Sequence, residues 1–192
     1  MLSQTNKLII MANTTWALDP THSELQFKVK HLMISTVSGQ FNQFSGTVET
    51  EDDDFSTAKV HFEAEVNSIS TNNEQRDMHL KAEDFFDVEK YPKVLFEGER
   101  MEKKGEDEYK LYGTIIIRGV SKKLALDVEF GGITEDPWGN TRTGFSVTGK
   151  LNRLDYGISF GSVSETGGLL LGDEVRISAN VQFVKQVVAE LV

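Results

Sequence analysis

The sequence predicts an all-β protein, an extended antiparallel eight-stranded barrel with a short helical crossing segment at about residues 71–90. Apolar and polar residues alternate along most of residues 16–183, as they do in strands with one dry and one wet face. Only residues 67–92 break this rhythm. Several inward positions hold Gly or Ala where a packed core favours Leu or Phe, so we expect a hollow apolar interior.

The elements follow one another with short turns. The run at 60–66 alternates without a fault, and the run at 174–183 repeats the pattern over ten residues. The period slips by one residue between Phe41 and Phe44, which predicts a β-bulge. Residues 71–81 carry capping residues before an acidic first turn and basic residues later, as a short helix does. The strands expected are a short leading one at 15–18 and eight longer ones at 24–31, 39–51, 58–66, 94–98, 109–118, 124–130, 145–151 and 174–183.

Composition restricts the class of protein. We expect one domain at 15–188, preceded by a disordered tail at 1–14. A net charge of -10 argues against nucleic acid as a partner, because phosphate would be repelled. The chain has no cysteine, so disulfides and thiolate metal sites are excluded. The first residues hold no evident signal peptide; a cytoplasmic location is therefore expected, with the periplasm left open.

Residues 16–183 hold an ordered series of short motifs. They are Trp16 to Ser23, Phe27 to His31, Val37 to Phe41, Phe44 to Gly46, Ser68 to Thr71, Arg76 to Leu80, Asp84 to Asp87, Tyr91-Pro92, Phe96, Gly113-Thr114, Arg118 to Lys122 and Asn152 to Gly157. In order and spacing, these motifs resemble those of the YceI-like family of polyisoprenoid-binding proteins. That resemblance implies a lipocalin-like barrel, often dimeric, which holds an isoprenoid chain or an isoprenoid quinone in its interior.

Two sets of residues are the candidate ligand contacts. A polar set at the barrel mouth is expected to bind a head group, or else only to stabilise the fold: His22, Arg76, Asp77 and His79. An apolar set is expected to line the tunnel: Phe27, Val29, Phe41, Phe62, Ala64, Phe85, Phe86, Phe96, Gly113, Val147, Ile177 and Ala179. No catalytic or metal-binding residues are assigned, because His22 and His31 are too far apart along a strand to share an ion.

The function that these observations favour is non-catalytic binding, carriage or sequestration of a long apolar lipid. No cofactor is expected beyond such a lipid, and no stable membrane insertion. An enzyme for a small hydrophobic substrate and a stress-related scaffold without ligand are the alternatives. The run at 115–117 puts an isoleucine on the outer face in either register and predicts a homodimer. The apolar part of the loop at 159–173 suggests a lid, a partner contact or a membrane contact, or else simple packing across the barrel mouth.

Overall fold

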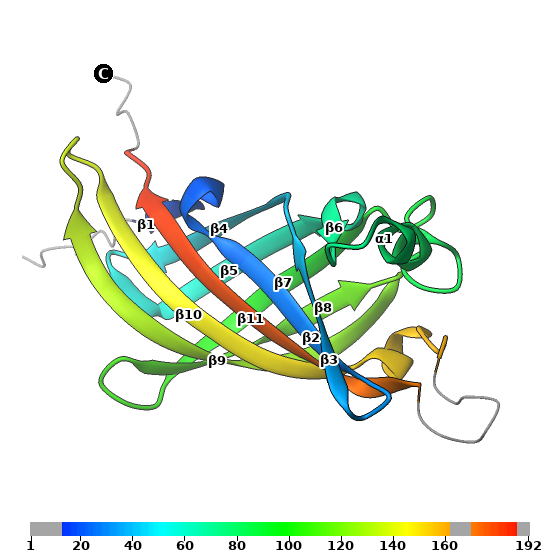
Figure 1. Cartoon of the computed structure of the whole chain (residues 1–192). Helices are drawn as coiled ribbons and strands as arrows, with labels where there is room; N and C mark the ends of the chain where they lie inside the picture. Colours follow the sequence, from blue (N-terminus) through cyan, green and yellow to red (C-terminus); the bar gives the residue numbers. More distant parts are fainter. Residues whose placement is uncertain (1–12, 162–169, 188–192) are drawn as a thin grey trace, which may run out of the picture.

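The structure, a computed structural model, describes residues 13–161 and 170–187 (Figure 1). Within these residues it contains eleven strands, one α-helix and three short 3-10 helices. The elements are β1 (Asn13–Leu18), η1 (Pro20–His22), β2 (Glu24–His31), β3 (Ser35–Phe41), β4 (Phe44–Glu51), β5 (Asp54–Glu65), η2 (Val66–Ser68), β6 (Ile69–Ser70), α1 (Glu74–Lys81), β7 (Lys93–Lys103), β8 (Glu108–Ile117), β9 (Val120–Glu135), β10 (Thr141–Asn152), η3 (Arg153–Tyr156) and β11 (Leu171–Lys185).

Eight of the strands form a closed antiparallel barrel, which confirms the predicted fold class. Their order is β1-β4-β5-β7-β8-β9-β10-β11, and the pairing of β1 with β11 closes the ring. Side chains of β8 alternate strictly between buried and half-buried positions, so one face of the strand points into the barrel. Closure leaves no free edge within the ring.

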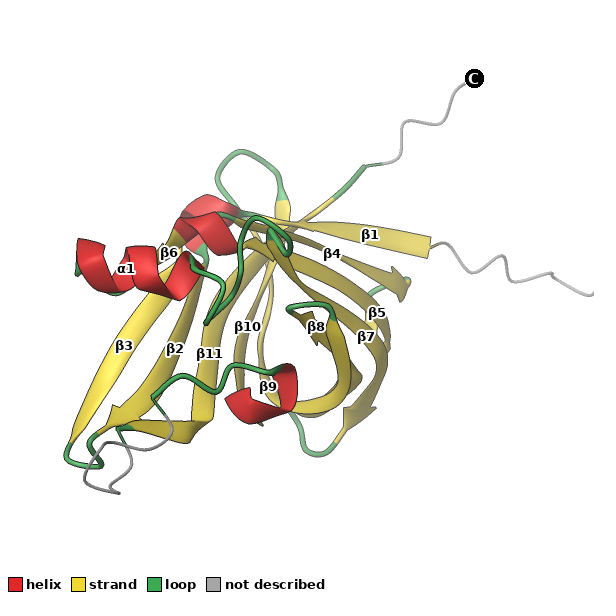
Figure 2. Ribbon diagram, turned by 90° about the vertical axis from the view of Figure 1, so that its right-hand side faces the viewer, coloured by secondary structure: helices red, strands yellow, loops and turns green. Residues whose placement is uncertain are grey.

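The hairpin of β2 and β3 stands outside this ring and widens the barrel at one end. The end of β11 at 183–185 pairs with β1, whereas its earlier part pairs with β2 between Leu171 and Asn180. At the narrow end, β1 lies beside β11. At the other end, β2 and β3 take this place beside β11 (Figure 2). A barrel wall with more strands encloses a wider interior, so the barrel opens toward α1 and η3.

The structure corrects two details of the predicted elements. The slip between Phe41 and Phe44 is not a bulge, because β3 ends at Phe41 and β4 begins at Phe44 with different neighbours in the sheet. The helix begins at Glu74, where the Asn73 side chain accepts a hydrogen bond from the Arg76 amide. The tail expected at 1–14 lies outside the described residues except for Asn13 and Thr14, which belong to β1.

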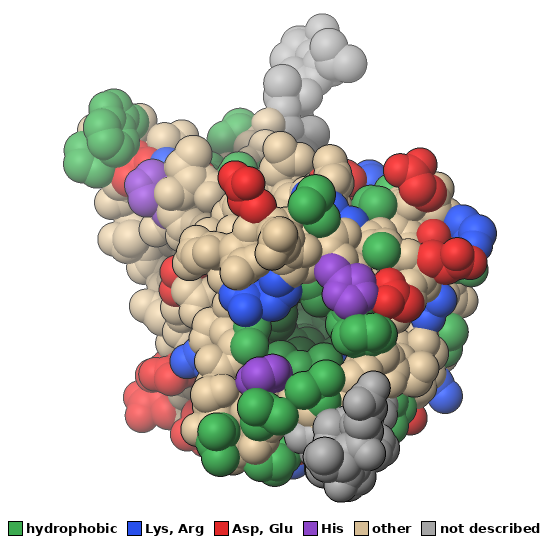
Figure 3. Space-filling model, turned by 45° about the vertical axis from the view of Figure 1, so that its right-hand side comes forward, with side chains coloured by type: hydrophobic (Ala, Val, Ile, Leu, Met, Phe, Trp, Pro, Cys, Tyr) green, Lys and Arg blue, Asp and Glu red, His purple; other side chains and the backbone are tan. Residues whose placement is uncertain are grey.

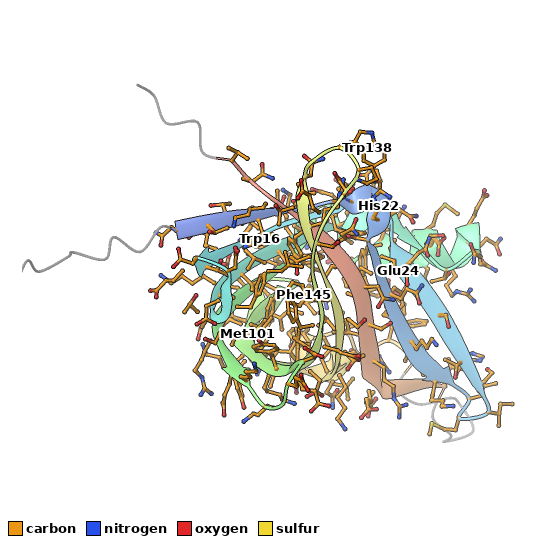
Figure 4. The ribbon with its side chains drawn as sticks, turned by 90° about the vertical axis from the view of Figure 1, so that its left-hand side faces the viewer. Trp16, His22, Glu24, Met101, Trp138 and Phe145 are labelled. Carbon is orange, nitrogen blue, oxygen red and sulfur yellow. The ribbon has the colours of Figure 1, made fainter. Side chains whose placement is uncertain are left out.

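Aromatic side chains fill the narrow end of the barrel (Figure 4). Trp16 is fully buried, and its indole Nε1 donates a hydrogen bond to Thr50 Oγ1 at 3.2 Å. The Phe55 ring lies 5.4 Å from the Trp16 ring and 5.0 Å from the Phe145 ring, at distances typical of attractive aromatic pairs. This end is therefore packed and closed.

Inward glycines do not leave empty space, contrary to the expectation from their size. A Cβ on Gly113 would lie 2.6 Å from the Phe96 ring, and one on Gly149 would lie 2.3 Å from a Leu126 methyl carbon. The glycines make room for large side chains of the neighbouring strands. The interior is hollow elsewhere, where the strands themselves diverge.

A half-buried arginine ties η1 to the hairpin that joins β9 and β10. Arg142 contacts Asp136 at 2.6 Å and Asp19 at 2.7 Å, and all three side chains are less than a fifth exposed. Hydrogen bonds from Thr21, Arg142 and His22 hold the pKa of Asp19 well below its usual range. The hydrogen bond from Arg142 likewise holds the pKa of Asp136 well below its usual range.

We expect Arg142→Met to lower the melting temperature most at neutral pH. Since both carboxyls have a depressed pKa in the folded protein, their stabilising contribution is complete above the unfolded pKa of about 4 and is lost as the pH falls further. The difference between wild type and variant should therefore shrink below about pH 4. Lys150→Gln, which removes an exposed ion pair with Glu174, should change little at any pH and serves as the control. A constant difference for Arg142→Met across the pH range would contradict this account.

Candidate ligand-binding site

An apolar cavity of about 250 Å³ runs through the barrel and opens at the wide end (Figure 3). This volume is slightly below the range of about 300–1,000 Å³ that is typical of ligand pockets. The wall includes side chains of nine strands, from β2 to β11, and the far end reaches Phe55 and Phe145 of the aromatic cluster. Three of its residues, Gln26, Arg153 and Tyr156, have polar groups in their side chains. We call the open end of the cavity, on the side of α1 and η3, the mouth; Leu80, Phe86 and Tyr156 line the cavity from these elements and the segment after α1.

Most of the predicted tunnel residues line this cavity, although their contact with a ligand stays a prediction. Three of them do not: Ala64, Gly113 and Ala179. Ala179 pairs with Val147 and Leu25, and both of these residues line the cavity. The methyl group of Ala179 is shorter than their side chains and does not reach the cavity surface. The lining residues among the predictions are Phe27, Val29, Phe41, Phe62, Phe85, Phe86, Phe96, Val147 and Ile177.

Arg76 and Asp77 on α1 both bind the buried Thr71. Arg76 donates to the Thr71 hydroxyl at 2.7 Å and to its carbonyl oxygen at 2.8 Å. Asp77 Oδ1 accepts from the amide of Thr71 at 2.8 Å and from its hydroxyl at 2.6 Å. These bonds fix the start of α1 to the end of β6. The structure thus shows a structural role for both residues, and their binding of a head group remains a prediction.

His79 links the two sides of the mouth. Its ring meets Phe85 edge-on at 4.9 Å and Phe160 at 4.6 Å, and Nε2 lies 2.7 Å from Asp84 Oδ2. Phe85 lines the cavity, and Phe160 follows η3 on the opposite side. His79 therefore belongs to the rim of the mouth rather than to the cavity wall.

His22 lies away from the mouth, in η1 near Trp138 (Figure 4). Its Nδ1 is 2.8 Å from Asp19 Oδ2, and Ser23 Oγ donates to the Asp19 carbonyl oxygen. These bonds close a turn, and His22 lies apart from the other three polar candidates.

Arg153 is the residue at this site that the sequence interpretation missed. Its guanidinium group is 3% exposed, and burial lowers its pKa. It donates to the carbonyl oxygens of Ile158, Phe160, Leu171 and Gly172 at 2.7–3.0 Å. Arg153 thus joins η3 to the start of β11 at the rim. Arg153 Nη2 also lies 3.6 Å from Asp173 Oδ1.

Residues 13–161 and 170–187 contain no group of three His, Cys, Asp or Glu side chains placed to hold a metal ion. No helix within the same ranges has the length and apolar character needed to span a membrane.

Residues 16–183 match the model of the YceI-like domain family. The chain belongs to this family. Among curated relatives of this YceI-like protein, UPF0312 protein SA2479 of Staphylococcus aureus (strain N315) is 42% identical over 171 residues, which are 88% of this chain and 97% of that protein. UPF0312 protein MW2606 of Staphylococcus aureus (strain MW2) has the same identity and coverage.

Solved structures with the same fold include the YCEI protein of Campylobacter jejuni, which is 31% identical with a TM-score of 0.71 and covers 82% of this chain and 90% of its own. BcnA of Burkholderia cenocepacia is 19% identical with a TM-score of 0.75, covering 86% and 98%. A polyisoprenoid binding domain of Saccharophagus degradans, implicated in plant cell wall breakdown, is 14% identical with a TM-score of 0.70, covering 89% and 98%. At such low identity, the last two similarities establish the fold alone.

We expect Arg153→Met to destabilise the rim of the mouth. Methionine fills a similar volume but leaves several buried carbonyl oxygens without a donor, at a cost of about 1–3 kcal/mol for each one that water does not reach. The melting temperature should fall by several degrees, as measured by circular dichroism.

Arg118→Met is the matched control, because Arg118 also donates to two carbonyl oxygens, those of Gly157 and Glu83, but from a more exposed position. Its effect should be clearly smaller, since water can replace the lost donor. Equal losses in the two variants would show that the burial of Arg153 adds nothing.

Proposed function

We propose that this YceI-like protein binds a long apolar lipid, such as a polyisoprenoid or an isoprenoid quinone, inside its barrel without catalysing a reaction on it. The observation that carries the proposal is the continuous apolar wall of the cavity, which is closed by aromatic rings at one end and open at the other. A chain-shaped ligand can enter such a site end first. The polyisoprenoid binding domain of Saccharophagus degradans, which has the same fold, supports this class of ligand.

The energetics favour a long chain over a compact one. Burial contributes about 0.8 kcal/mol per methylene, so roughly ten buried carbon groups give about 8 kcal/mol. Association costs offset several kcal/mol of this gain. A short chain is therefore held weakly, and affinity increases with the length of chain that the barrel encloses.

Carriage or sequestration fits this site better than chemistry does. The cavity wall holds one charged group, Arg153, and its guanidinium is engaged with backbone carbonyls. A guanidinium group does not exchange its proton near neutral pH, so it cannot act as a general acid or base there. A homodimer remains a prediction: Ile115 and Ile117 point into the cavity, and only Ile116 of the run is directed outward.

Filling the cavity should abolish binding. Val147 lines the cavity from β10, while Thr148 is the next residue and points outward. Val147→Trp should weaken a long-chain fluorescent fatty acid by at least roughly tenfold, because the indole occupies the space that the chain needs. Thr148→Trp adds the same side chain to the outside and should bind like wild type.

Both variants are compared by fluorescence titration and by their β-type circular dichroism spectra. If Val147→Trp loses the fold because of overpacking, Val147→Phe repeats the test with a smaller ring. A folded variant with a filled cavity and unchanged affinity would mean that the ligand binds elsewhere.

Arg76→Ala separates head-group binding from a purely structural role. If Arg76 binds the head group, the affinity for a quinone-headed chain falls by about 1–3 kcal/mol, while that for a hydrocarbon of equal length hardly changes. Thr71→Val is the matched control, because it removes the hydroxyl that Arg76 binds and leaves the charge of Arg76 in place. Equal losses for both ligands, in both variants, would leave Arg76 only a structural role.

A further inference from the structure

The turn between β2 and β3 exposes three successive apolar side chains. Leu32, Met33 and Ile34, which we call the hairpin tip, are 46%, 57% and 85% exposed. Leu32 and Met33 also have φ angles of 50° and 59°, in the left-handed region that Gly and Asn adopt at little cost. The chain thus accepts backbone strain and exposed apolar surface at the same point. Residues with this kind of strain are enriched at functional sites.

The hairpin tip is part of the mouth end of the barrel. The Leu32 amide donates to the Leu170 carbonyl oxygen at 2.9 Å, and His31 pairs with Leu171, which lines the cavity. Hydrophobic side chains gather around the hollow in Figure 3. Of the nine large apolar side chains that are exposed in the described residues, six belong to elements at this end: Leu32, Met33, Ile34, Met78, Leu154 and Phe160.

The charge of this hairpin differs from that of the whole protein. Residues 25–48 contain Lys28 and Lys30 and no Asp or Glu, in a chain whose net charge is -10. Both lysines are exposed on the outer face of β2, and neither forms an ion pair within the described structure. Lys28 also pairs across the sheet with Arg176 of β11. An anionic bilayer has phosphate groups at its surface and acyl chains beneath them. An apolar hairpin tip followed along the strand by lysine side chains is complementary to this arrangement.

We propose that the hairpin tip docks this protein reversibly on the surface of an anionic lipid bilayer. Leu32, Met33 and Ile34 enter the boundary between head groups and acyl chains, and Lys28 and Lys30 contact lipid phosphates. This contact brings the mouth close to the membrane, so that an apolar chain passes between bilayer and barrel with little exposure to water. The proposal goes beyond the proposed function, because docking requires no particular occupant of the cavity.

The decisive variant replaces Leu32 by Asn and Met33 by Gly together. Asn-Gly favours the φ angles present here, so the variant should fold with an unchanged or higher melting temperature. Its binding to vesicles of phosphatidylglycerol and phosphatidylcholine, measured by flotation, should fall at least roughly tenfold, since each inserted side chain contributes on that scale. Trp138→Ser removes an apolar side chain that is 81% exposed on the β9–β10 hairpin and should leave binding unchanged.

The contribution of charge is tested separately with Lys28→Gln and Lys30→Gln. Each should weaken binding to phosphatidylglycerol vesicles by roughly fivefold and leave the weaker binding to pure phosphatidylcholine unaffected. Since the chain has no cysteine, Ile34→Cys can be labelled at a single site with an environment-sensitive fluorophore. Its emission should shift to the blue on anionic vesicles, whereas the same label at Trp138→Cys should not respond.

Three outcomes would overturn the docking proposal. One is that the Asn-Gly variant binds vesicles with the same affinity as the wild type. Another is that the fluorophores at positions 34 and 138 show the same change in emission on anionic vesicles. The third is a wild-type dimer in solution, seen by light scattering, together with a monomeric Asn-Gly variant. The hairpin tip would then bind a second copy of the chain instead of a bilayer. The Val147→Trp variant has a filled cavity and an unchanged hairpin tip, so we expect it to bind vesicles like the wild type. Docking and cavity binding can therefore fail independently.

Discussion

The hydrogen-bonding edge of β11 that faces away from β10 is divided between two strands, and the shape of the barrel depends on that division. Near Phe183 this edge pairs with β1, whereas between Leu171 and Asn180 it pairs with β2. The backbone N–H and C=O groups of a strand edge need hydrogen-bond partners. The ring therefore closes through β1 at one end, and the β2–β3 hairpin extends the wall at the other. The taper of the interior follows from the backbone before any side chain is considered.

Side chains then give the two ends opposite properties. Trp16, Phe55 and Phe145 fill the narrow end, where inward-facing rings come within about 5 Å of one another. At the wide end the inward residues cannot meet, and the cavity remains. The rim is fixed by polar groups instead: Arg153 binds backbone carbonyls of two segments, and the α1 residues bind Thr71. Polar contacts thus hold the rim in place, and the interior behind it stays apolar.

The alternation of residue types was sufficient to predict the barrel, because a strand has only two faces, and the capping residues before residue 76 predicted the crossing helix. Nine of the twelve predicted tunnel residues line the cavity, but many other residues of its wall were not named. It could not distinguish a bulge from a chain reversal between Phe41 and Phe44, since both shift the period by one residue. The small size of Gly113 also led to a wrong prediction that this position borders the cavity. The space above this glycine is filled by the Phe96 ring of the neighbouring strand. Arg153 was missed for a related reason: its partners are backbone carbonyls, which leave no pattern in the sequence.

The central claim is that the cavity holds a long apolar chain in the protein as it occurs. Organic extraction of purified protein, followed by mass spectrometry, tests this most directly, with Val147→Trp purified in parallel to account for lipid that adheres to the surface. The account predicts a stoichiometric long-chain lipid in the wild-type extract and its loss from the variant. Equal amounts of the same lipids in both extracts, or none in either after mild purification from cells that contain them, would contradict it.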